Sequence, residues 1–336
     1  MSINIDGKVK RIGLALSGGG FRAAAFHLGV FRKLREQGLL WNLDLLTCVS
    51  GGSIAGAFLV CHWGEDDALD KLHDYLRKTS IAVSSVIGGL LDPFESRLDK
   101  LAESYERDLY GKRSLGSLQS GPRLYLNATN LATGNMFFFV AGGGGLAEMG
   151  EWELGAVPAH GFRLSRAVAA SSAFPPVFPP LRMGHAEYPS EEVDFVCLTD
   201  GGVYDNLGVN PLLRRRNALD YVIVSDAGKP FSLHERPTES GAAVLLEAID
   251  ILMEQVRGLQ FKRLELNAAA EGGAKPVWFS IDSTVGQARE GDAAFASAIG
   301  TNLRRLGSAE MDVLTRHAGA LLEHRLQAYV PELLAG

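Results

Sequence analysis

The feature that most constrains this chain is a pair of similar units near its start, about thirty residues apart. In each unit a short apolar run leads into a turn rich in serine and glycine, and apolar residues at helical spacing follow. The runs are 12–16 and 43–49, and the helical patterns are 23–34 and 54–63. Buried parallel strands are nearly continuous apolar runs, and helices usually connect them. The two units therefore predict an α/β fold with helices covering a parallel sheet.

The remainder of the chain continues this pattern of strands and helices. We expect further strands, the first two paired with each other, at 123–129, 136–140, 194–199, 220–225 and 277–281. We expect further helices at 66–79, 93–110, 164–172, 242–269 and 311–330. No break in composition marks a boundary, so we expect one domain over residues 1–336. Within it we expect a helical and loop insertion at about 64–120 and a C-terminal helical part at about 241–336.

Two apolar segments have open interpretations. Residues 81–91 are apolar, interrupted by glycine and too short to cross a bilayer. We interpret them as a loop or helix facing the core, with a lipid groove or mobile lid as the alternative. The helix expected at 242–269 either packs internally or contacts a partner.

Composition excludes several classes of protein. The chain has 336 residues, of which 46% are hydrophobic and 21% charged, as in ordinary globular proteins. The net charge of −6 gives no overall basic field for nucleic acid. Residues 1–11 do not resemble a signal peptide, and no apolar run is long enough to predict a transmembrane helix. We expect a cytoplasmic protein, with peripheral membrane association and signal-less export left open, and three reduced cysteines.

The second turn is the candidate mount for a nucleophile. A serine held clear of the backbone at a sharp strand-to-helix turn crowds the residues two before and two after it. Around Ser53 these residues are Gly51 and Ala55, which are both small, whereas Ser50 lies nearer the strand and follows Cys48 by two residues. We therefore expect Ser53 to be the nucleophile. The alternative is that Ser53 only caps the helix.

The first turn is a candidate anion site. Consecutive glycines allow backbone N–H groups to converge on one point near a helix N-terminus. Gly18, Gly19 and Gly20 could bind the oxyanion of an acyl-transfer intermediate in this way, and Arg22 could add charge or brace the loop. Phosphate binding is the alternative, although the run lacks the Gly-Lys-Ser/Thr of a P-loop.

A serine nucleophile also needs a base. Asp200 ends a predicted strand, and Gly201 and Gly202 after it allow close approach. An aspartate can accept a serine proton if burial raises its pKa. Asp226 is an alternative base, and Asp205 could instead fix the loop.

A Ser-His-Asp triad is less consistent with the sequence. None of the eight histidines lies in a glycine-rich loop after a strand, and only one strand precedes the strand that carries the proposed nucleophile. No cluster of residues has metal-ligand spacing, so we expect neither a metal nor another cofactor.

Several segments together resemble one family. The chain is similar to the patatin-like phospholipases, which are related to the cytosolic phospholipase A2 catalytic domain, over about residues 11–230. The segments that carry the resemblance, in the family's order, are 18–22, 51–56, 127–134, 169–176 and 200–202. Two positions depart from the family pattern: alanine occupies positions 23 and 55, where glycine is usual.

The resemblance implies a fold and a reaction. The fold would be a three-layer α/β/α arrangement with a mostly parallel central sheet. Ser53 and Asp200 would form a catalytic dyad, and Gly18, Gly19 and Gly20 would form the oxyanion hole. Arg22 would be the family's basic residue after the glycines, and the glycines at 51, 52, 201 and 202 would support the site.

The reaction implied is hydrolysis of fatty-acyl esters through an acyl-enzyme, with phospholipid or lysophospholipid in a lipid or membrane surface as the substrate. Three alternatives remain. They are a soluble esterase or thioesterase, a phosphate- or dinucleotide-binding protein, and an inactive scaffold with the same fold.

Overall fold

A computed structural model describes residues 3–5, 7–81, 95–231 and 239–334. All of the apolar segment 81–91 except Ile81, and also His234, lie outside the described residues. Within the described ranges, no helix combines the length and the apolar character needed to cross a bilayer.

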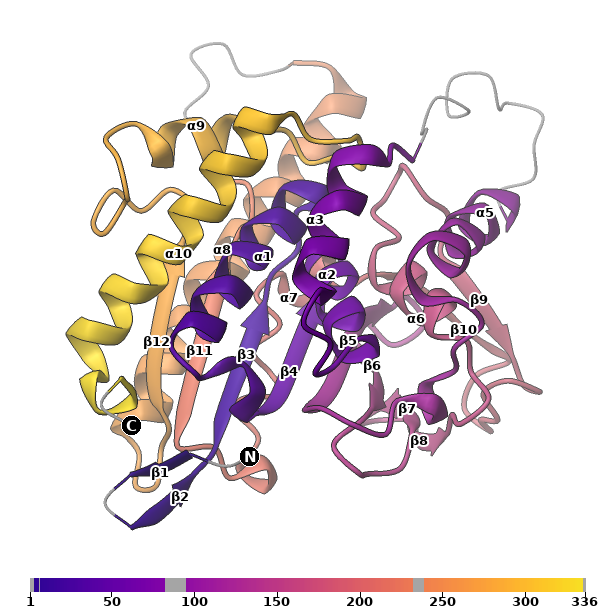
Figure 1. The fold of residues 1–336 in the computed structure, drawn as a ribbon. Coiled ribbons are helices and arrows are strands. Elements are labelled where there is room, and N and C mark those ends of the chain that lie inside the picture. Colours follow the sequence, from indigo (N-terminus) through magenta and orange to yellow (C-terminus); the bar gives the residue numbers. More distant parts are fainter. Residues whose placement is uncertain (1–2, 6, 82–94, 232–238, 335–336) are drawn as a thin grey trace.

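A ten-stranded sheet forms the centre of the described chain (Figure 1). Its strands are β3 (Ile12–Leu16), β4 (Leu43–Val49), β5 (Arg123–Asn130), β6 (Met136–Ala141), β7 (Glu148–Glu151), β8 (Gly155–Pro158), β9 (Leu181–Gly184), β10 (Phe195–Asp200), β11 (Tyr221–Asp226) and β12 (Lys275–Ser280). The neighbours β12, β11, β3, β4 and β5 are parallel, and antiparallel strands extend the sheet beyond β5. A separate hairpin pairs β1 (Ile3–Ile5) with β2 (Lys8–Lys10).

Helices cover both faces of the sheet. The longer ones are α1 (Gly20–Glu36), α2 (Gly51–Cys61), α3 (Ala68–Lys78), α5 (Glu95–Tyr105), α6 (Leu164–Ser171), α8 (Gly241–Ala269), α9 (Asp292–Ala298) and α10 (Ser308–Tyr329). The short helical segments are η1 (Leu40–Asn42), the π-helical η2 (Glu106–Tyr110), η3 (Leu115–Ser117), α7 (Gly202–Asp205), η4 (Arg215–Asn217) and η5 (Pro331–Leu333).

The alternation of side chains along β3 produces two cores. Leu14 and Leu16 point to the face covered by α1, where they join Phe26 in the larger core. Ala15 points to the opposite face and joins Leu264 of α8 in the smaller core. Because successive side chains of a strand face opposite sides, both faces of a buried parallel strand must be apolar. The predicted α/β/α class is thereby confirmed.

Helices α1 and α10 cross at close range on the larger core. A Cβ atom added at Gly29 of α1 would lie 2.3 Å from the Thr315 carbonyl oxygen of α10. The ring centroids of Phe26 in α1 and His317 in α10 are also 6.1 Å apart at this crossing. The absence of a side chain at Gly29 therefore sets the distance between the two helices.

Candidate active site

The sheet brings the ends of two strands together beside β5. Val49, the last residue of β4, pairs with Asn127, and Asp200, the last residue of β10, pairs with Ala128. Both β4 and β10 therefore lie on the same side of β5, one after the other. The turn after β4 consequently begins beside the Asp200 carboxylate.

This turn has the geometry of a sharp strand-to-helix elbow. Ser50 has φ 51° and ψ −116°, a region that residues with side chains rarely occupy, and it is partly exposed. A Cβ atom at Gly51 would lie 2.2 Å from the Gly20 carbonyl oxygen, and one at Gly52 would lie 2.3 Å from the Leu16 carbonyl oxygen. The two glycines thus allow the elbow to lie directly against the end of β3.

Ser53, the nucleophile expected from the sequence, is in a different position. It lies inside α2 with no exposed surface, and its Oγ is 2.8 Å from Oγ of Ser171. The Ser171 hydroxyl is also 2.6 Å from the Asn127 carbonyl oxygen, which can only accept, so Ser171 donates there. Ser53 must then donate its proton to Ser171, which also accepts the backbone N–H of Ser50 at 3.1 Å.

The expectation for Ser53 therefore needs correction. Within the described residues no hydrogen bond joins Ser53 to Asp200, and its proton is already used. Ser50 is instead the serine close enough to Asp200 to affect its ionisation. Ser53 and Ser171 instead stabilise the elbow, because Ser171 binds both the Ser53 hydroxyl and the Ser50 backbone N–H.

Asp200 is a buried carboxylate with one oxygen unused. Its Oδ1 accepts the Gly202 N–H at 2.7 Å. Its Oδ2 is buried, and no described residue forms a well-aligned hydrogen bond to it. Burial raises the pKa of Asp200 to about 7, while the Gly202 amide and the nearby Ser50 hydroxyl oppose this rise.

The triple-glycine turn lies beside the elbow. A Cβ atom at Gly18 would lie 3.1 Å from Cβ of Ser50. The Gly18 amide donates to the Asn206 carbonyl at 3.1 Å, so it is not available for an anion. Among the described residues, none accepts the amides of Gly19 and Gly20, which have φ +141° and +62°. These two amides, and that of Gly51 after the elbow, are the candidate anion donors.

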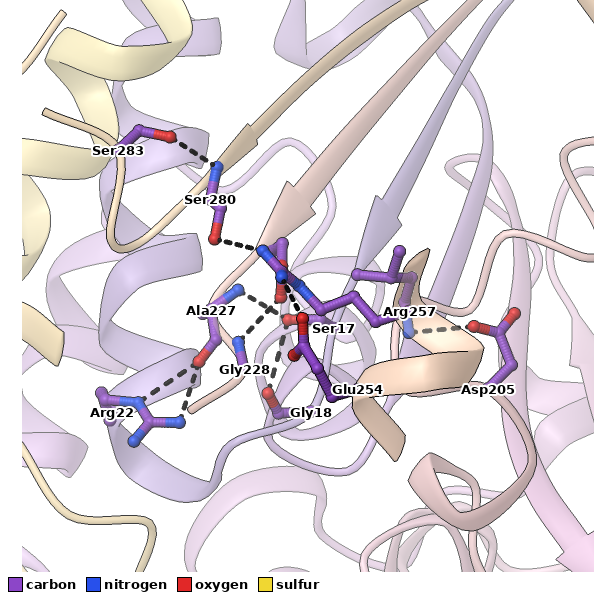
Figure 2. Close-up of polar contacts among 12 residues, drawn as sticks. Ser17, Gly18, Arg22, Asp205, Ala227, Gly228, Glu254, Arg257, Ser280 and Ser283 are labelled. Atoms are coloured by element: carbon purple, nitrogen blue, oxygen red, sulfur yellow. Dashed lines mark hydrogen bonds and ion pairs between the residues drawn. The ribbon is translucent and has the colours of Figure 1, made fainter. Parts of the chain in front are cut away.

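Arg22 braces this turn from behind. The guanidinium is completely buried and donates to the carbonyl oxygen of Ala227 from Nε at 3.2 Å and from a terminal nitrogen at 3.0 Å. Its other terminal nitrogen donates to the Ile299 carbonyl at 2.8 Å. Burial lowers the pKa of Arg22 to about 10. Figure 2 shows Arg22 at the Ala227 carbonyl, so of the two expected roles the structure supports the bracing one.

The two alternative carboxylates are engaged in loop structure. Asp205 accepts the backbone N–H groups of Leu207 and Val209, each at 3.0 Å, and so fixes the loop after α7. Asp226 forms an ion pair with Arg257 at 2.6 Å. Arg257 also donates to Ser280, as Figure 2 shows.

Histidine is absent from the hydrogen bonds of this site within the described residues. His27 is the nearest to the first turn, and its ring contacts the Ser225 hydroxyl and the Ser17 carbonyl. This arrangement leaves the Ser50 and Asp200 pair without an imidazole between them in the described part of the chain.

Comparisons with known proteins identify a family and a fold. A sequence model described as patatin-like phospholipase matches residues 14–213. Comparison with curated protein sequences gives no significant match.

Among solved structures, human GIVD cytosolic phospholipase A2 aligns with a TM-score of 0.62 over 96% of this chain and 60% of that chain, at 15% identity. The same human protein in complex with methyl gamma-linolenyl fluorophosphonate aligns with a TM-score of 0.60 over 97% of this chain and 59% of that chain, also at 15% identity. At this identity the likeness concerns the fold alone. The chain spans about 60% of the length of these structures.

Proposed function

This chain belongs to the patatin-like phospholipase family, and on that premise we propose that it hydrolyses fatty-acyl esters of phospholipids or lysophospholipids with Ser50 as nucleophile and Asp200 as base. The observation that carries the proposal is the buried Oδ2 of Asp200, which has no well-aligned hydrogen bond and lies near the Ser50 hydroxyl at the elbow. A buried carboxylate with a pKa near neutrality can accept a proton that an ordinary aspartate would leave in place.

The proposed reaction has two half-reactions. Asp200 takes the proton from Oγ of Ser50 as this oxygen attacks the ester carbonyl carbon, and the carbonyl oxygen becomes an oxyanion. As the carbon–oxygen bond to the alcohol breaks, Asp200 returns the proton to the departing alcohol, which leaves an acyl-enzyme. A water molecule then gives a proton to Asp200 and attacks the acyl carbon. The fatty acid departs and Ser50 regains its proton.

The oxyanion would be stabilised by backbone N–H groups. Gly19, Gly20 and Gly51 have amides without an acceptor among the described residues. Gly51 follows Ser50 in the chain, and a Cβ atom at Gly51 would lie 2.2 Å from the carbonyl oxygen of Gly20. Loss of one such donor typically lowers the rate by roughly 10²–10³-fold. Gly18 has a different role in this proposal, because its amide holds the loop of Asn206 in place.

The substrate class rests on the family and on the bound inhibitor of a structural neighbour. The human phospholipase was solved with methyl gamma-linolenyl fluorophosphonate, a fatty-chain fluorophosphonate. We propose that this chain reacts with reagents of the same class. A rise in ester hydrolysis when the substrate forms micelles or vesicles would support a lipid substrate, and its absence would favour a soluble esterase or thioesterase.

Labelling with a fluorophosphonate probe tests the assignment of the nucleophile. We expect mass spectrometry to find the adduct on Ser50, and we expect Ser50→Ala to abolish labelling and ester hydrolysis. Ser53→Ala is the matched control, since it removes a hydroxyl three residues away in the same helix turn, and it should retain labelling at Ser50 with reduced rate. An adduct on Ser53, or full hydrolysis by the Ser50→Ala protein, would contradict the proposal.

A further inference from the structure

Helix α8 has two halves with different surroundings. Its C-terminal half packs on the sheet, where Leu264 is buried and the rings of Phe261 and Trp278 lie 4.3 Å apart. Arg257, at the middle of the helix, is fixed to Asp226 at the end of β11. Because Asp226 is the last residue of β11, α8 reaches the end of the sheet that carries the candidate site at about Arg257.

The N-terminal half of α8 extends beyond that edge. At about 1.5 Å per residue, the helix reaches roughly 24 Å from Arg257 to its first residue, Gly241. Figure 1 shows this part of the helix continuing past the ends of the strands. Asp226, the partner of Arg257, also accepts the Gly228 N–H at 2.9 Å, and the Cβ position of Gly228 is 3.0 Å from the side chain of Asn206. Asn206 in turn holds Gly18, so the projecting half begins next to the candidate site.

Large apolar side chains are exposed over much of the circumference of this half. Leu245 is 68% exposed, Leu252 64%, Leu246 46%, Ile251 46% and Val244 44%. With about 3.6 residues per turn, Leu252 lies almost above Leu245, while Leu246 and Ile251 lie roughly 100° and 120° away on opposite sides. A helix that is apolar on most sides needs an apolar environment on most sides.

We propose that the projecting half of α8, residues 241–253, inserts into the surface of the lipid aggregate that holds the substrate. This inference rests on the proposed function and adds the surface through which the enzyme reaches its substrate. The segment is too short to cross a bilayer, which needs about 20 apolar residues, so it would enter one leaflet only.

A lipid surface fits these residues better than a second copy of the chain. Leucine recurs every seven residues along α8, at 245, 252, 259 and 266, as in a helix that pairs with another helix. Such a pairing would cover one stripe and leave Leu246 and Ile251 exposed to water. Lipid would cover all of the exposed apolar side chains of the projecting half together.

The charges of the segment specify the kind of lipid. Glu247 and Asp250 are the charged residues of 241–253, so the segment carries negative charge and no positive charge. Attraction of a juxtamembrane segment to anionic lipids comes from lysine and arginine, which this segment lacks. The segment therefore fits a neutral or zwitterionic surface, and binding should change little with salt.

Paired double variants on one stripe of α8 test the inference. Leu245→Glu/Leu252→Glu alters the projecting half, and Leu259→Glu/Leu266→Glu makes the same change in the half that lies along the sheet. The control residues are comparably exposed, at 65% and 61%. We expect the first pair to lower partition onto phosphatidylcholine vesicles by about tenfold or more, since a buried leucine side chain contributes this much or more. We expect the second pair to leave partition and hydrolysis unchanged.

The measurements separate this inference from the proposed function. Vesicle flotation is done in the Ser50→Ala background, where binding should persist without hydrolysis, and thermal unfolding midpoints establish that each variant is folded. Equal loss in both double variants would overturn the inference, as would stronger binding to phosphatidylserine-rich vesicles. Sedimentation that shows a dimer dissolved by Leu245→Glu/Leu252→Glu, with vesicle binding intact, would assign the helix to a second copy instead. Intact binding by a wild-type chain that hydrolyses no ester would refute the function and leave this inference standing.

Discussion

At the scale of single residues, the proposed mechanism makes activity depend on the ionisation of Asp200. Burial holds the pKa of this carboxyl at about 7, and only the deprotonated form can accept the Ser50 proton. We therefore expect kcat/KM for a soluble ester to rise about tenfold per pH unit up to about pH 7 and then to level off. A pH profile of kcat/KM measures this, and a profile that is flat between pH 5 and pH 8 would contradict it.

Ionisation of Asp200 raises the expected activity as the pH rises, but it lowers the stability of the fold. The folded-state pKa of Asp200 lies above its ordinary value of 3.8, so the folded protein holds this proton over the range from about pH 4 to about pH 7. The contribution of Asp200 to stability therefore falls as the pH rises through this range. Asp200→Asn removes this fall, and at pH 8 the variant should unfold at a higher temperature than the parent while lacking activity.

The choice between two neighbouring serines could not be made from local sequence. Ser50 and Ser53 both have small residues nearby, and steric reasoning within five residues favoured Ser53. The proposal for Ser50 rests on Ser171, which is far away in the chain and accepts the proton of Ser53. The places of Asp200 and of the glycine turn in the fold could be predicted, because Asp200 ends one recognisable strand and the glycine turn follows another.

At the scale of elements, the turn between β3 and α1 is held by a neutral imidazole. His27 of α1 donates from Nε2 to the Ser17 carbonyl at 2.9 Å and accepts at Nδ1 from the Ser225 hydroxyl at 3.0 Å. A charged ring could not accept the second hydrogen bond. Burial accordingly lowers the pKa of His27 from 6.5 to about 4.

This imidazole predicts an acid-sensitive component of stability. The folded pKa of His27 is below its unfolded value, so its contribution is complete above pH 6.5 and is lost progressively as the pH falls towards 4. The loss is on the order of 3 kcal/mol. His27→Gln cannot titrate, so from pH 7.5 to pH 4.5 the free energy of unfolding in urea should fall less, or rise more, for this variant than for the parent. The difference between the two proteins isolates His27 from Asp200 and Asp205, whose raised pKa values act in the opposite direction.

The expected bounds of helices and strands agree with the structure in some elements and differ in others. The bounds of β3 and β4 agree with the structure because both are continuous buried apolar runs. Helix α2 was expected to start at residue 54 but begins at Gly51, since glycine is a poor helix former and tertiary contacts override this preference. That shift moves the elbow from Ser53 to Ser50. The short strands β7, β8 and β9 have four residues each, too few for a clear pattern.

At the scale of the whole molecule, the crossing of α1 and α10 joins the two ends of the chain. We expect Gly29→Ala to lower the free energy of unfolding by about 2 kcal/mol, because its Cβ would lie 2.3 Å from the Thr315 carbonyl oxygen. Gly258→Ala is the matched control in α8, where a Cβ meets nothing within 4 Å. That variant should be neutral or more stable by up to about 1 kcal/mol. Urea unfolding of both proteins measures the contrast, and equal midpoints would contradict it.

The sequence could not have predicted this crossing. Periodicity indicates that a helix has an apolar face, but it does not indicate which other helix covers that face. Gly29 and Thr315 lie at opposite ends of the chain, and their contact follows only from the order of strands in the sheet.

Both ends of the described chain lie on the side of the sheet away from Ser50. The hairpin β1–β2 leads into the start of β3, and Glu332 near the other end contacts Tyr221 and Lys275 at the starts of β11 and β12. Figure 1 shows the two termini on this side. A tether to a solid support attached near either of these ends would leave the side that carries Ser50 and Asp200 facing away from the support.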